Sequence, residues 1–95
     1  MIKRVVRMKF RKEELASFLA VFDIKKEKIL QFEGCQEVNL LQDIHDENTC
    51  FTISIWNSEE DLNNYRHSDF FQSTWKNVKT KFEEKPLAWS LKIIA

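Results

Sequence analysis

Residues 35–56 read CQEVNLLQDIHDENTCFTISIW and contain the pattern that decides the fold. Two β-rich runs, Cys35–Gln42 and Thr49–Trp56, flank the polar, turn-prone residues Asp43–Asn48. β-Branched and aromatic residues favour strands, and a short polar connection between two such runs favours an antiparallel hairpin. We therefore predict two neighbouring strands joined by a solvent-exposed loop, and we place the other elements around them.

The two cysteines, Cys35 and Cys50, lie at opposite ends of this predicted hairpin. With the turn near Asp46, Cys50 lies level with Asp43, so Cys35 is on the order of 25 Å away along the sheet. A disulfide requires Cα atoms within about 7 Å of each other. The hairpin therefore excludes an intrachain disulfide, and we expect two buried thiols.

The segment before the hairpin predicts a strand and then a long helix. Ile2–Phe10 alternates apolar and charged residues, as a strand does. An apolar stripe at helical spacing follows, formed by Leu15, Phe18, Leu19, Phe22 and Ile29. Gly34, the only glycine of the chain, lies just past this stripe, where a left-handed residue can close the turn into the hairpin.

Two helix starts follow the hairpin, each marked by a serine that can accept a backbone N–H. Ser58 begins a capping-box sequence, and Ser68 repeats the start signal. The second of these helices is predicted to bury a stripe formed by Phe71, Trp75, Val78 and Phe82. Its solvent face is predicted to carry Lys76, Lys79 and Lys81. Pro86 ends the helical region, and Leu87–Ile94 alternates well enough to form a last strand.

These elements predict one α+β domain over residues 1–95. Two right-handed crossovers around a hairpin give the ferredoxin-like βαββαβ arrangement, with an antiparallel sheet and helices on one face. Leu87–Ile94 has apolar residues on both sides, and such a strand is usually covered on both. Two sheets packed face to face in a homodimer would supply the second cover. We expect the dimer interface to include Arg7, Asn39, Trp89 and Leu91.

Composition and motifs exclude several functional classes. Fifteen basic and fifteen acidic residues are interleaved, so no positive field exists to attract nucleic acid. No apolar run approaches the roughly 20 residues that span a membrane, and residues 1–10 do not resemble a signal peptide, so we expect a cytoplasmic protein. His45 lies in the hairpin loop without a second His or Cys at ligand spacing, which predicts no metal site.

Three stretches, Phe32–Cys35, Leu40–Asp43 and Ser54–Leu62, resemble the antibiotic biosynthesis monooxygenase family in order and spacing. The segments Tyr65–Phe71 and Pro86–Ser90 continue the resemblance, which thus covers nearly the whole chain. It implies a homodimer whose two sheets form an α+β barrel, with a pocket in each subunit between its own sheet and helices. The family includes cofactor-free oxygenases that form quinones, and heme-degrading enzymes.

The cofactor-free branch implies a dry pocket for a small phenol or quinol, with a base or hydrogen-bond donor and access for O₂. We expect this pocket to be lined by Phe22, Trp56, Tyr65, Phe70 and Trp75. Many family members have His where this chain has Tyr65 and Phe70, which leaves Tyr65 and His67 as candidate catalytic residues. Tyr65 is alternatively a core residue, and His67 a surface or capping residue. The missing histidines also favour a second hypothesis, a non-catalytic dimer that binds or senses a small ligand.

The heme-degrading branch is disfavoured by its own motif. Its members pair a strand Asn with a Trp and an axial His, and alignment places Val6, Tyr65 and Trp75 at these three positions. Because Trp does not ligate iron, the resemblance gives the chain no axial heme ligand. We therefore predict that the protein uses no cofactor.

Overall fold

The computed structural model describes residues 1–95, in which four strands form one antiparallel sheet. These strands are β1 (Ile2–Lys9), β2 (Cys35–Gln42), β3 (Thr49–Trp56) and β4 (Leu87–Lys92). Their order across the sheet is β2-β3-β1-β4, and all neighbours are antiparallel. This is the ferredoxin-like topology, so the predicted βαββαβ fold of the single chain and the predicted hairpin are confirmed.

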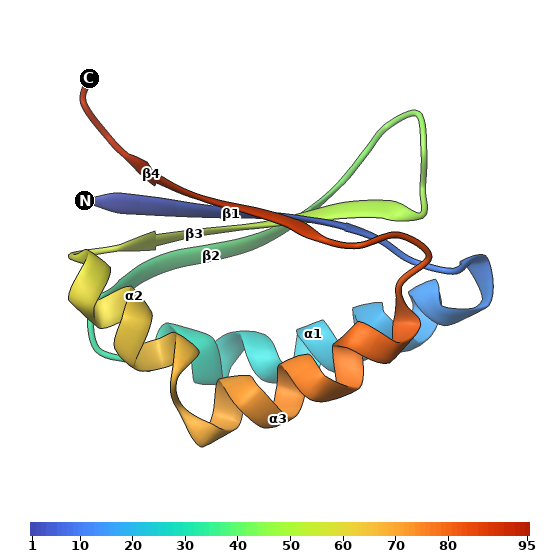
Figure 1. The fold of residues 1–95 in the computed structure, drawn as a ribbon, viewed down its shortest axis with the longest axis horizontal. Helices are drawn as coiled ribbons and strands as arrows, with labels where there is room; N and C mark the ends of the chain where they lie inside the picture. Colours follow the sequence, from blue (N-terminus) through green and yellow to red (C-terminus); the bar gives the residue numbers. More distant parts are fainter.

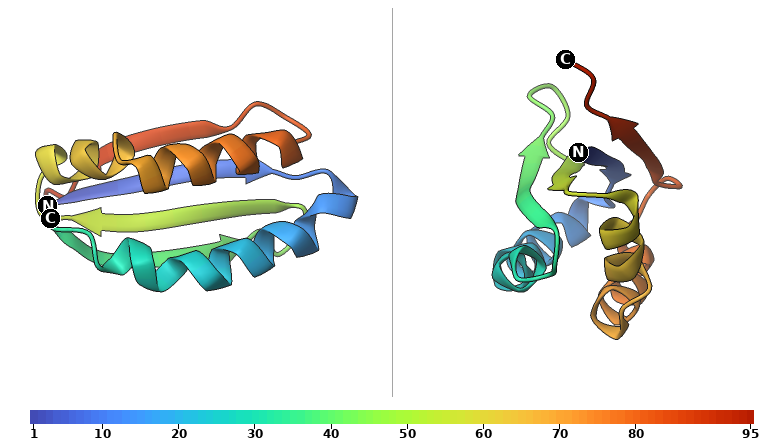
Figure 2. Two further views of the ribbon diagram at one scale, coloured as in Figure 1. Left: turned by 90° about the horizontal axis from the view of Figure 1, so that it is seen from below. Right: turned by 90° about the vertical axis from the view of Figure 1, so that its left-hand side faces the viewer.

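Three helices cover one face of this sheet (Figure 1). They are α1 (Leu15–Leu30), α2 (Glu59–Arg66) and α3 (Asp69–Val78). Figure 2 shows α1 beneath the β2 side of the sheet, whereas α2 and α3 lie beneath the side of β1 and β4. None of the helices is long and apolar enough to cross a membrane. The helical layer therefore consists of two separated rows.

Local chemistry fixes the ends of the helices as predicted. The Ser58 hydroxyl accepts the N–H of Asp61, and the Ser68 hydroxyl accepts the N–H of Phe71, both at 3.1 Å. Gly34 has a φ of +83°, the left-handed region that favours glycine. A Cβ atom at this position would also overlap the side chain of Asp61. Gly34 thus closes the turn between α1 and β2 for two independent reasons.

The hairpin register separates the two cysteines as predicted. Gln42 lies opposite Cys50, while Cys35 lies opposite Trp56 at the other end. Both thiols are free, and Cys50 is buried, but Cys35 is only half-buried, which corrects the expectation for that residue. Burial raises the pKa of both thiols, so they stay protonated at neutral pH.

Two predictions about the end of α3 are wrong. The helix ends at Val78 and a 3₁₀ turn follows, so Phe82 is not part of its stripe; instead its backbone bridges to Phe10. The rings of Phe82 and Phe10 still pack, with centroids 5.3 Å apart. Lys81 does not face solvent, because its ammonium lies 3.2 Å from a Glu14 carboxylate oxygen and its side chain is only 12% exposed.

The buried side chains form two clusters under the two ends of the sheet. The first consists of Met8, Phe10, Phe18, Cys50 and Val78. The second consists of Ile29, Val38, Trp56 and Leu62. Phe22 packs against both clusters. Leu19, predicted to lie on the buried stripe of α1, is 39% exposed because it points about 100° around the helix from Phe18. The core is therefore divided along the length of α1.

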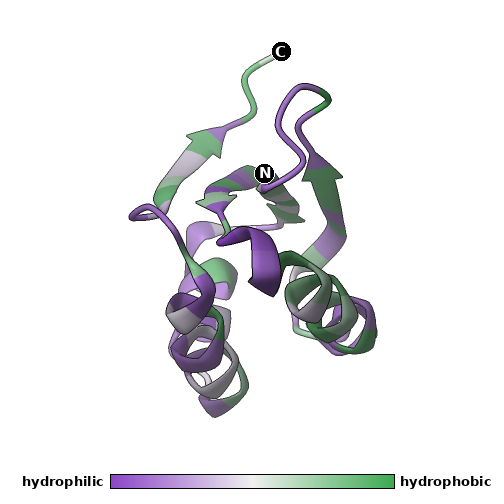
Figure 3. Cartoon of the chain, turned by 90° about the vertical axis from the view of Figure 1, so that its right-hand side faces the viewer, coloured by the Kyte–Doolittle hydropathy of each residue, from purple (hydrophilic) through white to green (hydrophobic).

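The other face of the sheet carries no helix, although its strands bear hydrophobic residues (Figures 1 and 3). Side chains alternate along a strand, so the residues between those of the core point to this outer face. Its apolar members include Val5, Phe51, Ile53, Ile55, Leu87, Trp89 and Leu91. Arg7 and Asn39 lie on the same face. Trp89 is 42% and Leu91 48% exposed, so single-chain packing leaves this apolar surface in contact with water.

Candidate ligand cavity

A cavity of about 350 Å³ lies between the sheet and the two rows of helices. Met8 and Phe18 of the first core cluster border it, as do Ile29 and Val38 of the second cluster. It occupies the region where the core is divided. Small-molecule sites in proteins are mostly apolar cavities of roughly 300–1,000 Å³, so this one has the size and character of a ligand site.

Aromatic rings from α2 and α3 form one wall of the cavity. Trp75 stacks on Phe71 with ring centroids 6.0 Å apart, and Phe71 meets the ring of Tyr65 edge-on at 5.1 Å. Tyr65 in turn stacks on the fully buried Trp56 at 5.0 Å. Because each ring is held by the next, the wall is positioned before any ligand enters.

Three of the five residues predicted to line the pocket do border the cavity, namely Phe22, Tyr65 and Trp75. Trp56 lies behind Tyr65 with no exposed surface, and its indole N–H donates to the Ser54 hydroxyl at 2.9 Å. Phe70 points toward α1, where its ring lies 5.1 Å from the ammonium of Lys25. Trp56 therefore supports the aromatic wall from behind, and Phe70 contacts α1. Neither residue lines the cavity.

Tyr65 is both a core residue and a cavity residue. Its ring packs in the second cluster, while its hydroxyl makes no hydrogen bond within the chain. Burial, with a smaller contribution from nearby Cys35, raises the pKa of the phenol well above its usual range. At neutral pH the hydroxyl is therefore protonated, so it can donate a hydrogen bond to a ligand but cannot act as a base.

His67, the other predicted catalytic candidate, lies outside the cavity. It is exposed at the C-terminal end of α2, where its Nδ1 hydrogen-bonds to the Asn63 carbonyl at 2.8 Å. His45 is in the hairpin loop, so no imidazole borders the cavity. Trp75, at the position that carries the axial ligand in heme-degrading relatives, cannot ligate iron. The residues present thus do not fit a heme group.

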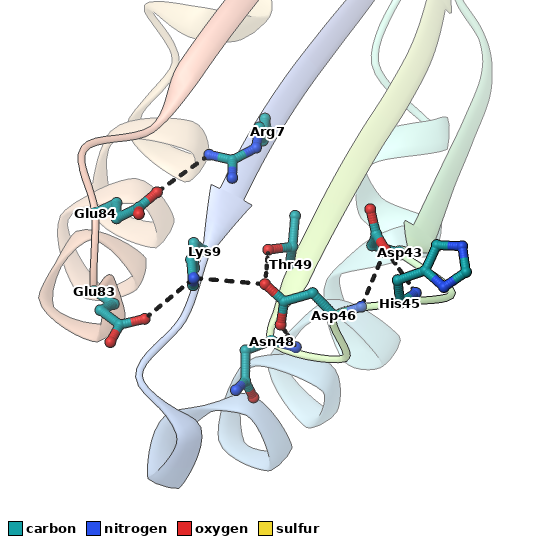
Figure 4. A network of polar contacts seen from close by, with 9 residues as sticks. All are labelled: Arg7, Lys9, Asp43, His45, Asp46, Asn48, Thr49, Glu83 and Glu84. Atoms are coloured by element: carbon teal, nitrogen blue, oxygen red, sulfur yellow. Dashed lines mark hydrogen bonds and ion pairs between the residues drawn. The ribbon is translucent and has the colours of Figure 1, made fainter.

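The acidic residues of the hairpin loop are used to order the turn (Figure 4). One oxygen of Asp43 accepts the N–H groups of His45 and Asp46, at 2.7 and 3.0 Å. Asp46 accepts the Thr49 hydroxyl at 2.8 Å and pairs with Lys9 at 3.5 Å. The hydrogen bond from Thr49 is the main cause of a lowered Asp46 pKa. No group of three or more His, Cys, Asp or Glu residues converges as metal ligands would.

Sequence reasoning missed the two arginines of the cavity, Arg4 and Arg66. Arg4 points inward from β1, and its guanidinium donates to the Ser90 hydroxyl of β4 at 2.9 Å. Burial and the nearby charge of Arg66 lower the pKa of Arg4. The missed signal was the strand alternation itself, which puts Arg4 in the inward row with Val6 and Met8. No acidic residue borders the cavity, so its polar end is positively charged.

The protein is thus a ferredoxin-like domain with an aromatic-lined cavity between its sheet and its helices. The family model described as antibiotic biosynthesis monooxygenase matches residues 1–77, and the chain belongs to this family. No curated protein matches the chain in sequence.

Solved structures of similar proteins show the same fold. The crystal structure of an antibiotic biosynthesis monooxygenase superposes with a TM-score of 0.92 at 16% identity, covering 100% of both chains. A conserved protein from Methanosarcina mazei Go1 gives 0.91 at 18% identity, covering 96% of this chain and 90% of that one. Rv0793 from Mycobacterium tuberculosis gives 0.91 at 14% identity, covering 99% and 95%. At these identities the likeness establishes the fold alone.

The protonation of Tyr65 can be measured directly, because it is the only tyrosine of the chain. An exposed tyrosine is half-ionised near pH 10. Since burial raises the Tyr65 pKa, we expect the folded protein to show little phenolate absorbance at that pH. The protein unfolded in urea is the control and should titrate near pH 10. Half-ionisation of the folded protein at or below pH 10 would contradict the burial of this hydroxyl.

Proposed function

We propose that the protein is a cofactor-free monooxygenase acting on a small phenol or quinol bound in the cavity. The observation that carries this proposal is the aromatic cavity of about 350 Å³ in a chain of the antibiotic biosynthesis monooxygenase family. The rings of Tyr65, Phe71 and Trp75 provide a surface on which a flat aromatic ligand can pack.

The proposed reaction needs no bound redox group. A phenol and O₂ give a quinone and water: one oxygen atom becomes the second carbonyl on a ring carbon, and the other leaves as water. The hydrogens of the phenol hydroxyl and of that ring carbon complete the water molecule. The phenol supplies all four electrons that reduce O₂, so no other reductant is consumed.

The chain's contribution to this reaction would be orientation and electrostatics. The cavity holds the ring and excludes water, which strengthens charge interactions within it. The guanidinium groups of Arg4 and Arg66 favour the ionised phenol, since a neighbouring positive charge lowers the pKa of an acidic ligand. The protonated Tyr65 hydroxyl is available to donate a hydrogen bond to the same oxygen.

Oxygen consumption tests the proposal. With a panel of phenols and quinols of one to three rings, we expect O₂ uptake that equals the quinone formed and is unaffected by a metal chelator. Tyr65→Phe removes the cavity donor and should slow turnover by about 10-fold or more. His67→Ala, outside the cavity, is the control and should leave the rate unchanged. No uptake above buffer with any member of the panel would contradict the enzyme hypothesis.

The second candidate function is ligand binding or sensing without turnover. It is favoured by one observation, the absence of Asp, Glu and His from the cavity lining, which leaves no side chain able to accept a proton at neutral pH. Tight binding of an aromatic ligand without O₂ uptake in the same experiment would support this function.

We also propose that the protein works as a homodimer paired through the outer face of the sheet. Val5 on β1 lies between Trp89 of β4 and Ile53 of β3, and Ile53 neighbours Asn39 of β2. This row forms the centre of an apolar surface with exposed aromatic and aliphatic side chains, a feature typical of subunit contacts. A second copy of the same face would cover it symmetrically.

The dimer is tested by light scattering at micromolar concentration. We expect a mass of about twice the 11.4 kDa of one chain, and a monomer for Trp89→Glu, because a buried unpaired carboxylate opposes association. Ile24→Glu is the matched control, since Ile24 is an apolar residue that is 77% exposed on α1, away from this face. A wild-type monomer, or a dimer unaffected by Trp89→Glu, would contradict the proposal.

A further inference from the structure

Arg4 and Arg66 restrict the chemical class of ligand that the cavity can bind. We infer that the cavity selects an aromatic carboxylate, whose anionic group lies between Arg4 and Arg66 while its ring packs on the aromatic wall. This inference deepens the proposed function, because it uses the same cavity, and it specifies the charge of the ligand.

Arg4 borders the cavity, where a bound ligand can reach its guanidinium. It lies on β1, a central strand, and points inward in a row with Ser54 of β3 and Ser90 of β4. One bond, to the Ser90 hydroxyl at 2.9 Å, is the only side-chain hydrogen bond of its guanidinium, which has five N–H donors. Most of its hydrogen-bonding capacity is therefore free for a ligand.

Arg66 approaches the same cavity from the last turn of α2. The side chain of Gln72 donates to its carbonyl at 2.7 Å, which ties the end of α2 to the first turns of α3. Its guanidinium makes no hydrogen bond or ion pair within the chain, yet it is close enough for its charge to lower the pKa of Arg4. Two like charges thus face one cavity, and an anion between them would relieve their repulsion.

Neither Arg4 nor Arg66 pairs with an acidic side chain, whereas other cations of the sheet and helices do. Arg7 and Lys9, on the same strand as Arg4, pair with Glu84 and with Asp46 and Glu83 (Figure 4). Lys81, whose side chain is 12% exposed, pairs with Glu14. A formal charge of zero shows that enough acids exist in the chain, but none of them borders the cavity. No acidic side chain of the chain neutralises the positive charge that borders the cavity.

A carboxylate fits the other polar groups that border the cavity. Its two oxygens match the planar donor forks of two guanidinium groups. Thr74 borders the cavity and its hydroxyl is buried without any hydrogen-bond partner, a state that is uncommon in folded proteins. The Ser54 hydroxyl accepts from the indole of Trp56 and so has its own hydrogen free to donate. The polar end thus supplies donors and no competing acid.

Calorimetric titration with matched ligand pairs tests the inference. We would compare benzoate with benzamide, and 2-naphthoate with 2-naphthamide, which have the same shape but differ in charge. We expect the carboxylate of a pair to bind about 10- to 100-fold more tightly, as charge-assisted hydrogen bonds would give. Arg4→Gln and Arg66→Gln should each remove most of this preference and leave amide binding nearly unchanged.

The control is Lys76→Gln, which removes one positive charge from the exposed face of α3 and should leave the preference intact. Thermal unfolding of each variant shows whether it is folded. If Arg4→Gln does not fold, Arg66→Gln, which changes a residue at a helix end, still tests the inference. Equal binding of carboxylate and amide, or a preference that survives both arginine changes, would overturn the inference but leave the aromatic site. Binding of no ligand in either pair would overturn the inference, whereas the proposed function is decided separately by O₂ uptake with the phenols and quinols.

Discussion

The hydrophobic core beneath the four-stranded sheet is divided into two clusters, one under each end of the sheet, and this division controls the rest of the structure. Each cluster takes side chains from both rows of helices, Phe18 and Val78 in the first and Ile29 and Leu62 in the second. Only Phe22 packs against both clusters. The space between them is the cavity of about 350 Å³. A small domain normally needs its core filled, so a cavity of this size costs stability that closer packing would recover. Such a cost supports the proposal that the cavity binds a ligand.

The two faces of the sheet carry different kinds of residues because side chains alternate along each strand. On β1, the inward row combines apolar residues with Arg4, while the outward row combines Val5 with charged residues. The inward row meets the cavity. The outward row is covered by no helix of the same chain, although Arg7 and Lys9 pair with acidic residues of the adjoining loops. In the proposed dimer, one face of the sheet borders the ligand cavity and the other face forms the subunit interface. The sheet would therefore connect the cavity to the interface.

The fold could be predicted from the sequence wherever local chemistry decides the structure. The polar loop before Thr49 and the alternation on both sides of it gave the hairpin register to within one residue at Cys50. The hydroxyls of Ser58 and Ser68 gave both helix starts. Periodicity failed at Phe82, because a 3₁₀ turn after Val78 changes the direction of the chain and the spacing alone does not reveal it.

The cavity was only partly predictable, for a physical reason. Tyr65 and Trp75 lie on the two helices that follow the hairpin, α2 and α3, and their aromatic character indicated them. Arg4 and Arg66 are far apart in the sequence, on a strand and at a helix end, and their convergence depends on how α2 packs against the sheet. A charged residue in an inward strand position was the available signal at Arg4; nothing comparable distinguished Arg66 from the other surface bases.

Ligand binding between the two core clusters is tested most directly by NMR of the three indole N–H groups, because each reports a different place. Trp75 borders the cavity, Trp56 lies in the core behind Tyr65, and Trp89 lies on the outer face. On addition of 2-naphthoate, the cavity assignment predicts the largest shift at Trp75, a smaller one at Trp56 and none at Trp89. A shift confined to Trp89, or saturating binding that leaves Trp75 unmoved, would contradict it.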